Sequence, residues 1–347
     1  MKDKAKTILR IVVSVVLIAA SGYYALKDVN FSELMRIVSN VSYFWIFASV
    51  PVILLSHWVR AMRWKTMLEP ALKKKSASTW NLFSAVMIGY AGNCVLPRGG
   101  EFIRPFVYSR REKVSFSTSF ATIIVERFID LITMIFLFGV IFLFLSHKIL
   151  KALPDIEPHK IIVPTVIVLG VMIVSFYPPV FRFMIRLFIK PFSLKLFDKL
   201  SQLFEKFLKG FAIIKTPSQY FRVTVESLVI WFLYTIPLYF MFFSFDFHLS
   251  YSLNFSDALI LIIVAGVSAT IAPTPGAIGI QHVMMQVAMV NIYGISKEAA
   301  LAYATVTHAV NYFIQLSVGG VFFMRENIKG IPSKVDYTSE LNTESAP

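Results

Sequence analysis

Long apolar runs alternate with short polar segments along this chain of 347 residues. Six of the runs approach the roughly 20 residues that a helix needs to cross a bilayer. The runs are 8–26, 41–58, 116–145, 161–177, 223–243 and 299–324. We therefore predict an all-α polytopic membrane protein with six transmembrane helices.

Two shorter apolar runs, 81–93 and 258–271, are each interrupted by a Pro- and Gly-rich loop. The loops are 96–100 and 273–279, and a second short helical stretch follows each. Paired, interrupted hydrophobic segments at matching places are typical of the re-entrant segments of inverted-repeat transporters. The alternative is that Pro97 and Pro273 only kink continuous spans, which would change the number of spans.

Composition agrees with a membrane protein, because 56% of the residues are hydrophobic and only 16% are charged. An ordinary soluble domain carries about 25% charged residues. The net charge of +14 does not indicate nucleic-acid binding, because the basic residues gather in the predicted loops rather than on one folded face. The single cysteine excludes an internal disulfide.

Lys and Arg set the orientation, because they accumulate in short cytoplasmic loops. With the N-terminus inside, twenty-seven basic residues fall in inside segments and six in outside loops. This predicts a cell (inner) membrane protein with both termini in the cytoplasm. The alternative that residues 2–21 form a cleavable signal peptide would remove the first span, which the symmetry of the two halves requires.

Under this topology the two halves of the chain are inverted copies of one another. The predicted first half is 1–146, with a re-entrant segment at 80–111. The predicted second half is 147–325, with a re-entrant segment at 256–293. A disordered cytoplasmic tail, 326–347, is predicted to follow. Within the second half, residues 181–215 combine aromatic and Lys residues at helical spacing. They predict an amphipathic helix on the anionic lipids of the inner leaflet, with a protein-binding role as the alternative.

Three ionisable residues lie inside the third predicted span: Glu126, Arg127 and Asp130. A charge in the hydrocarbon region needs a partner or a function. Spacings of three and four place these side chains on one side of the helix. One interpretation is that Arg127 only neutralises the carboxylates and locks the span to its neighbour. The other is that the three residues line a hydrated cavity.

The first interrupted segment adds Arg98, Glu101 and Arg104 to this cavity. A helix that restarts after a break exposes amide hydrogens, which suit an anion such as phosphate. Gly99 and Gly100 allow close backbone approach, and the guanidinium of Arg98 fits two phosphate oxygens. We therefore expect an anionic head group to bind here.

The second interrupted segment is nearly uncharged. His308, in the last span, is either a proton carrier or a neutral packing residue. The complete set of predicted substrate-binding residues is Asn93, Pro97, Arg98, Gly99, Gly100, Glu101, Arg104, Glu126, Arg127, Asp130, Thr274, Pro275, Gly276, Gly279, Gln281, His308 and Asn311. No catalytic residue, metal site or cofactor is expected.

Three sequence blocks resemble the lysylphosphatidylglycerol synthase transmembrane family, also called the flippase-like domain family. The blocks are 93–105, 125–130 and 273–279. The family includes the lipid-flipping domain of the multiple peptide resistance factor, so the resemblance implies lipid translocation. Gln281 and His308 depart from the family, which has a glutamate and often an arginine there. We expect this chain not to synthesise aminoacylated lipid, because the resemblance assigns that activity to a separate soluble domain.

The function predicted from these features is translocation of a lipid, or of a lipid-linked anionic head group, between leaflets. No phosphate-binding loop of the G-x-x-x-x-G-K-[ST] type occurs in the sequence, so ATP is not the expected energy source. One alternative is an intramembrane enzyme that modifies a lipid, with Glu126 and Asp130 as acid and base. The other is a non-transporting partner subunit of an envelope-lipid synthesis complex.

Overall fold

The computed structural model describes residues 2–72, 77–151 and 216–328, with short stretches between 157 and 194. Regular structure in these parts is helical. The elements are α1 (Lys2–Leu26), α2 (Phe31–Ser39), α3 (Tyr43–Leu72), α4 (Thr79–Val95), α5 (Gly100–Glu112), α6 (Phe116–Lys151), α10 (Pro217–Ser244), α11 (Phe247–Ser250), α12 (Phe255–Ile271), η1 (Pro275–Ala277), α13 (Ile280–Tyr293) and α14 (Lys297–Ile328).

Among the described residues, three helices are long and apolar enough to cross a membrane: Tyr43–Pro70, Phe116–Leu150 and Pro217–Ser244. Two shorter apolar helices, Ser14–Leu26 and Phe255–Ile271, accompany them. Large apolar side chains such as Phe47 and Phe144 are more than 70% exposed, as expected for a surface that faces lipid. The chain is therefore a multi-pass, all-helical membrane protein.

Several sequence predictions can be compared with these bounds. The predicted third span ends at Leu145, where α6 has non-helical backbone angles. The predicted second span is too short, because α3 continues to Leu72. The short helix α2 was not predicted. The fourth span, 161–177, the connection 181–215 and the tail after 328 lie largely outside the described residues, so the six-span count and the inverted repeat stay predictions.

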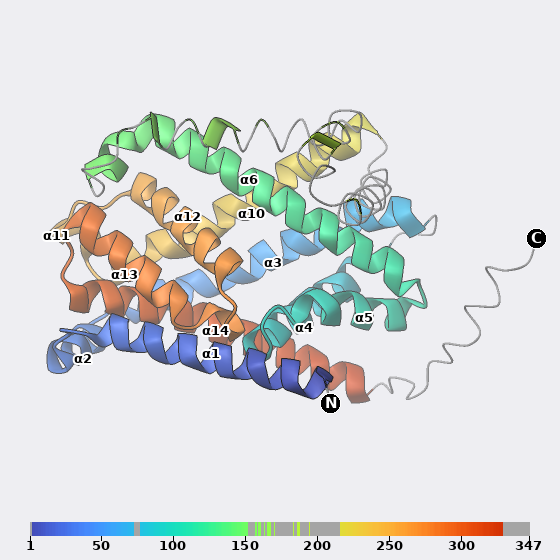
Figure 1. Cartoon of the computed structure of the whole chain (residues 1–347), viewed down its shortest axis with the longest axis horizontal. Coiled ribbons are helices and arrows are strands. Elements are labelled where there is room, and N and C mark those ends of the chain that lie inside the picture. Colours follow the sequence, from blue (N-terminus) through green and yellow to red (C-terminus); the bar gives the residue numbers. More distant parts are fainter. Residues whose placement is uncertain are drawn as a thin grey trace, which may run out of the picture.

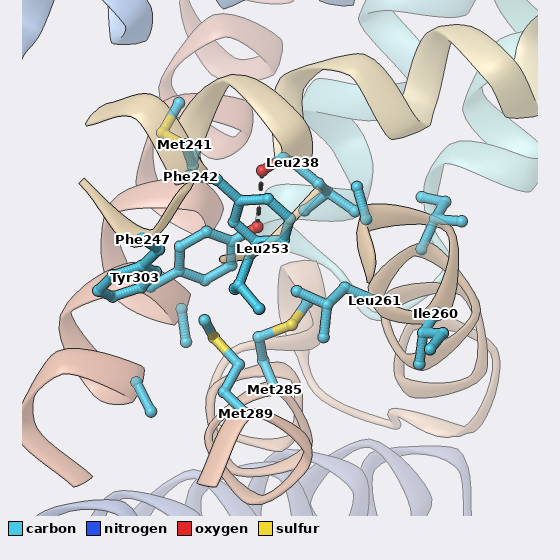
Figure 2. Close-up of a cluster of buried hydrophobic side chains, with 14 of the residues drawn as sticks. Leu238, Met241, Phe242, Phe247, Leu253, Ile260, Leu261, Met285, Met289 and Tyr303 are labelled. Atoms are coloured by element: carbon cyan, nitrogen blue, oxygen red, sulfur yellow. Dashed lines mark hydrogen bonds between the residues drawn. The ribbon is translucent and has the colours of Figure 1, made fainter. Parts of the chain in front are cut away.

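Helices α3 and α10 run side by side through the middle of the molecule (Figure 1). Helix α6 crosses along one side, and α1 lies on the opposite side beside α13. The largest apolar core joins α10, α12, α13 and α14 around Phe242, Met289 and Tyr303, as Figure 2 shows. The Tyr303 hydroxyl is buried there and donates a hydrogen bond of 2.8 Å to the Leu238 carbonyl, which satisfies both polar groups.

The chain forms a helix–loop–helix hairpin at both places where the sequence predicts an interruption. In the first hairpin, Asn81 at the start of α4 donates a hydrogen bond to Glu112 at the end of α5. In the second, the Tyr293 hydroxyl at the end of α13 donates to the carbonyl of Asp257, in the first turn of α12, at 3.4 Å. These bonds join the first and last turns of each hairpin, so the second arm folds back along the first. We call the loops 96–99 and 272–279 the first and the second break.

Helix α14 packs so closely on α4 that there is no room for a side chain at Gly319. A Cβ atom there would overlap the Met87 carbonyl oxygen and lie 2.6 Å from the Ala91 Cβ, whereas at Gly320 it would meet nothing within 4 Å. We expect Gly319→Ala to lower the free energy of unfolding by about 1–3 kcal/mol through overpacking. Gly320→Ala is the matched control and should be neutral or stabilising, because alanine favours a helix. Thermal unfolding in detergent compares the two, and equal midpoints would contradict this packing.

Candidate functional site

Two buried arginines of α3 pair with the carboxylates of α6. Arg60 and Arg63 are one turn apart, with side chains that are 4% and 0% exposed. Arg60 Nε lies 2.7 Å from Glu126 Oε1, and its Nη2 bonds Asp130. Arg63 Nη2 lies 2.6 Å from Asp130 Oδ1. The orientation argument had placed both arginines in a cytoplasmic loop, which is wrong because α3 continues past them.

Glu126 is the centre of this group. Its side chain is 0% exposed, and Oε1 accepts hydrogen bonds from Arg60 and, at 2.9 Å, from Arg104 of α5. Arg63 and Arg127 stand farther from the same oxygen, at 3.6 and 3.5 Å. We call the set the arginine–carboxylate cluster. Its members are Arg60, Arg63, Arg104, Glu126, Arg127 and Asp130.

Positive charge exceeds negative charge in this cluster, because four guanidinium groups surround two carboxylates. Arg127 is the accessible member, with its side chain 42% exposed and its Nη1 3.6 Å from Asp130. Glu101 stands 4.0 Å from Arg127 and is one-third exposed, so it compensates the excess only weakly. Arg127 reaches both carboxylates as predicted, but the buried arginines are their principal partners.

Aromatic side chains surround the buried arginines. The Arg104 guanidinium lies 4.0 Å from the ring centre of Trp64, a favourable cation–π distance. Arg60 Nη1 donates to the Tyr234 hydroxyl at 2.7 Å, and that hydroxyl lies 3.2 Å from the Tyr90 hydroxyl. Each hydroxyl both donates and accepts, so either tyrosine can supply the proton of this contact.

Several buried polar atoms around the cluster have no hydrogen-bond partner within the described part of the chain. They are Nε and Nη2 of Arg104, Nε of Arg63, Oε2 of Glu126 and both ring nitrogens of His57. Nε and Nη2 form one edge of a guanidinium, the edge that binds an oxyanion with two parallel hydrogen bonds. Because buried polar groups are almost always paired, the cluster has capacity for a ligand or for water.

The first break does not offer the open amide donors that we expected. Asn93 Oδ1 accepts the Gly100 amide at 2.8 Å. The amides of Glu101 and Phe102 bond carbonyls within the loop, at 3.3 and 3.1 Å. Arg98 is exposed, has a positive φ of 57°, and donates to the Thr270 carbonyl at the end of α12. It therefore contacts the end of α12, next to the second break, rather than the carboxylates of the cluster that it was predicted to join.

The carbonyls of the second break are bonded by side chains. Thr274 Oγ1 donates to the Ile278 carbonyl at 2.9 Å, and His308 Nε2 lies 2.8 Å from the Gly276 carbonyl. The carbonyl accepts, so His308 carries a proton on Nε2. The rings of His308 and His282 are 4.8 Å apart, edge to face. Asn311 does not reach the break, because its side chain bonds the Thr307 carbonyl one turn earlier.

The predicted residues thus fall into two groups. Glu101, Arg104, Glu126, Arg127 and Asp130 belong to the cluster region, and the remainder, except Asn311, lie at or beside the two breaks. The prediction missed Arg60 and Arg63, which look like loop residues because they follow directly after the apolar run 41–58. Tyr312 was expected to face the second interrupted segment but is not in the predicted set; its hydroxyl donates to the Cys94 carbonyl at 2.9 Å. Among the described residues, no group of three or more His, Cys, Asp or Glu side chains is arranged to hold a metal ion.

The chain is similar to membrane proteins of several archaea. It is 22% identical over 334 residues to glycosyltransferase AglD of Haloferax volcanii. The matched region covers 89% of this chain and 53% of AglD. It is 22% identical over 342 residues to a UPF0104 membrane protein of Pyrococcus horikoshii, with 92% and 97% of the two chains covered. A UPF0104 membrane protein of Methanocaldococcus jannaschii is 27% identical over 144 residues, 41% of this chain and 40% of that protein.

This chain spans about half the length of AglD, and nearly the whole of the Pyrococcus protein. No solved structure matches it. The model of the family described as lysylphosphatidylglycerol synthase TM region matches residues 8–319, which include both hairpins and the arginine–carboxylate cluster. The chain therefore belongs to the lysylphosphatidylglycerol synthase transmembrane family.

Proposed function

We propose that this protein moves a lipid with an anionic head group between the leaflets of the cell membrane. The observation that carries the proposal is the excess of guanidinium groups in a protein whose outer surface is apolar. Buried charge without full compensation is costly, and in membrane proteins it marks the path of a substrate. A phosphate on the lipid would supply the missing negative charge.

The cluster offers this phosphate two kinds of contact. Arg127 is accessible and makes only long contacts with its carboxylates, 3.5 Å and more, so it is able to turn toward a ligand. The unpartnered edge of Arg104, formed by Nε and Nη2, offers two donors deeper in the protein. In this proposal the two hairpins are re-entrant, the acyl chains stay in the bilayer, both termini are cytoplasmic and the energy source is not ATP.

Transport without chemical change fits the carboxylates better than catalysis does. Glu126 Oε1 accepts from two arginines at under 3 Å, and Asp130 is bonded by Arg60 and Arg63. Groups engaged in this way orient the arginines, whereas an acid–base catalyst needs a carboxyl that faces its substrate. The name of the Haloferax relative keeps a glycolipid among the candidate substrates, and the family name points to a phospholipid.

Purified protein in liposomes tests the proposal. A fluorescent phosphatidylglycerol is placed in both leaflets, and an impermeant reductant then bleaches the outer one, so continued loss of fluorescence reports translocation. Arg127→Gln should slow this loss roughly ten- to a hundredfold, the factor expected for hydrogen bonds to a charged group. Arg36→Gln, an exposed arginine on α2, is the control and should leave the rate unchanged.

Two results would contradict the proposal. One is a wild-type rate no faster than that of protein-free vesicles for phosphatidylglycerol and for a fluorescent glycolipid. The other is recovery of chemically altered lipid by mass spectrometry, which would favour an intramembrane enzyme. Equal translocation rates for the wild type and Arg127→Gln would mean that Arg127 does not contact the lipid during its passage.

A further inference from the structure

Tyr312 of α14 contacts the end of α4, directly before the first break, and Gly276 in the second break. Its hydroxyl donates a hydrogen bond of 2.9 Å to the carbonyl of Cys94, in the last turn of α4. Its ring lies against Gly276 in the second break, where a Cβ atom would be 2.8 Å from the ring carbon Cε2. Only glycine fits at this position, because φ is also +58°.

Two other side chains join the same region. Arg98 donates from the first break to the Thr270 carbonyl, and His308 holds the Gly276 carbonyl at 2.8 Å. The carbonyls at helix C-termini carry partial negative charge, so Arg98 is well placed at the end of α12. Each break contains one non-glycine residue with positive φ, Arg98 at 57° and Ala277 at 60°. Such residues are uncommon and persist where surrounding contacts hold them.

Cys94 lies beside the second break, because a Cβ atom at Gly276 would be 3.8 Å from the Cys94 Cα. This residue is 3% exposed, and its Sγ lies 3.7 Å from Gln315 Oε1. It is also the sole cysteine of the 347 residues, so thiol labelling of the natural chain reports on this one place.

We propose that the two breaks form a gate, closed in this structure, in which Tyr312 is the residue that couples one break to the other. Three side-chain bonds hold the gate: His308 to the Gly276 carbonyl in the second break, Arg98 of the first break to the Thr270 carbonyl at the end of α12, and Tyr312 to the Cys94 carbonyl at the end of α4. A bond of this kind contributes about two- to tenfold to an equilibrium between two states. Bonds of this strength keep most molecules in the closed state and still allow a minority to open. Opening separates Gly276 from Tyr312 and exposes the Cys94 thiol.

The packing around the gate indicates which side moves. Helix α14 is fixed to α4 by the close contact at Gly319, and Glu326 of α14 bonds Arg111 of α5. The first break and Tyr312 therefore belong to one packed unit. The second break and the adjoining end of α12 are attached to this unit by the His308 bond to Gly276, the Arg98 bond to Thr270 and the contact of the Tyr312 ring with Gly276. The Ser14 hydroxyl of α1 also donates to the Pro273 carbonyl, at 3.2 Å. The moving part in this proposal is the segment 270–279.

The experiment measures the rate at which a maleimide labels Cys94 in the full chain, in detergent or liposomes. Tyr312→Phe removes the hydroxyl alone and should speed labelling about two- to tenfold, because the bond to the Cys94 carbonyl no longer holds the ring against Gly276. Arg98→Gln should act in the same direction through the Thr270 contact. Tyr24→Phe is the control, since Tyr24 is 58% exposed and distant in sequence from either break, and should not change the rate.

A second reporter separates opening of the gate from unfolding. Ala61 is 0% exposed in α3, so in a chain with Cys94→Ser and Ala61→Cys the label reports loss of the whole fold. The gate predicts that Tyr312→Phe accelerates labelling at position 94 and not at position 61. Equal acceleration at both positions, no acceleration at position 94, or wild-type labelling at the rate of denatured protein would each overturn the proposal. None of these outcomes depends on the identity of the lipid.

Discussion

Replacing Glu126 by glutamine is expected to lower the free energy of unfolding by about 3–5 kcal/mol, the cost of breaking a buried ion pair from one side. Glutamine keeps the shape of the side chain and removes the charge that faces Arg60 and Arg104 at 2.7 and 2.9 Å. Both arginines are nearly inaccessible to solvent, so water cannot replace the lost carboxylate. Thermal unfolding of detergent-purified protein, together with the yield of monodisperse protein, measures the loss.

Two companion variants make this prediction specific. Glu101→Gln removes a carboxylate that is one-third exposed and 4.0 Å from Arg127, and should cost less than about 1 kcal/mol. The double variant Glu126→Gln with Arg104→Gln should lose less free energy of unfolding than the two single variants lose together. The reason is that Arg104→Gln removes a charge that Glu126→Gln leaves unpaired. A Glu126→Gln protein as stable as Glu101→Gln would mean that the buried ion pairs are absent in the membrane.

Gly100→Ala is the second change with a large expected effect. A Cβ atom at this position would overlap the Gly89 carbonyl oxygen, which belongs to the backbone of α4 and has no side-chain freedom to yield. We expect a loss of about 3 kcal/mol, the upper part of the range for overpacking, because the two arms of the first hairpin must separate. Arg104 lies one turn beyond Gly100, so the same displacement would draw its guanidinium away from Glu126.

Gly22→Ala is a suitable control for this prediction, because a Cβ at Gly22 meets nothing within 4 Å. The comparison uses thermal midpoints for stability and phosphatidylglycerol translocation for function. The hairpin would need a different geometry if Gly100→Ala matched Gly22→Ala in both measurements.

The hairpins illustrate how much of the fold the sequence contains. The run 258–271 and the loop 273–279 predicted a helix that ends at Ile271, and α12 ends there. Predictions of this kind succeed because proline lacks an amide donor and glycine permits positive φ. Both residues therefore interrupt a helix through their own backbone, independently of contacts with the rest of the chain. The same local reasoning placed Glu126, Arg127 and Asp130 on one side of a helix.

The partners of these residues could not be predicted in the same way. Arg60 and Arg63 stand 66 and 67 residues before their carboxylate partners, and nothing local distinguishes them from the Lys and Arg residues of a cytoplasmic loop. A guanidinium is stable at either place, in water or against buried carboxylates, so its residue type does not decide its environment. The environment of these two arginines is decided by the crossing of α3 with α6.

The sequence by itself therefore determined the helical membrane class, the family and the positions of both breaks, because these follow from apolar length and from the backbone chemistry of proline and glycine. Tertiary structure alone decided which arginines neutralise Glu126, that Arg98 bonds the end of α12, and that Tyr312 contacts both the end of α4 and the second break. Those pairings depend on distances between helices that are remote in the chain, and hydropathy carries no information about such distances.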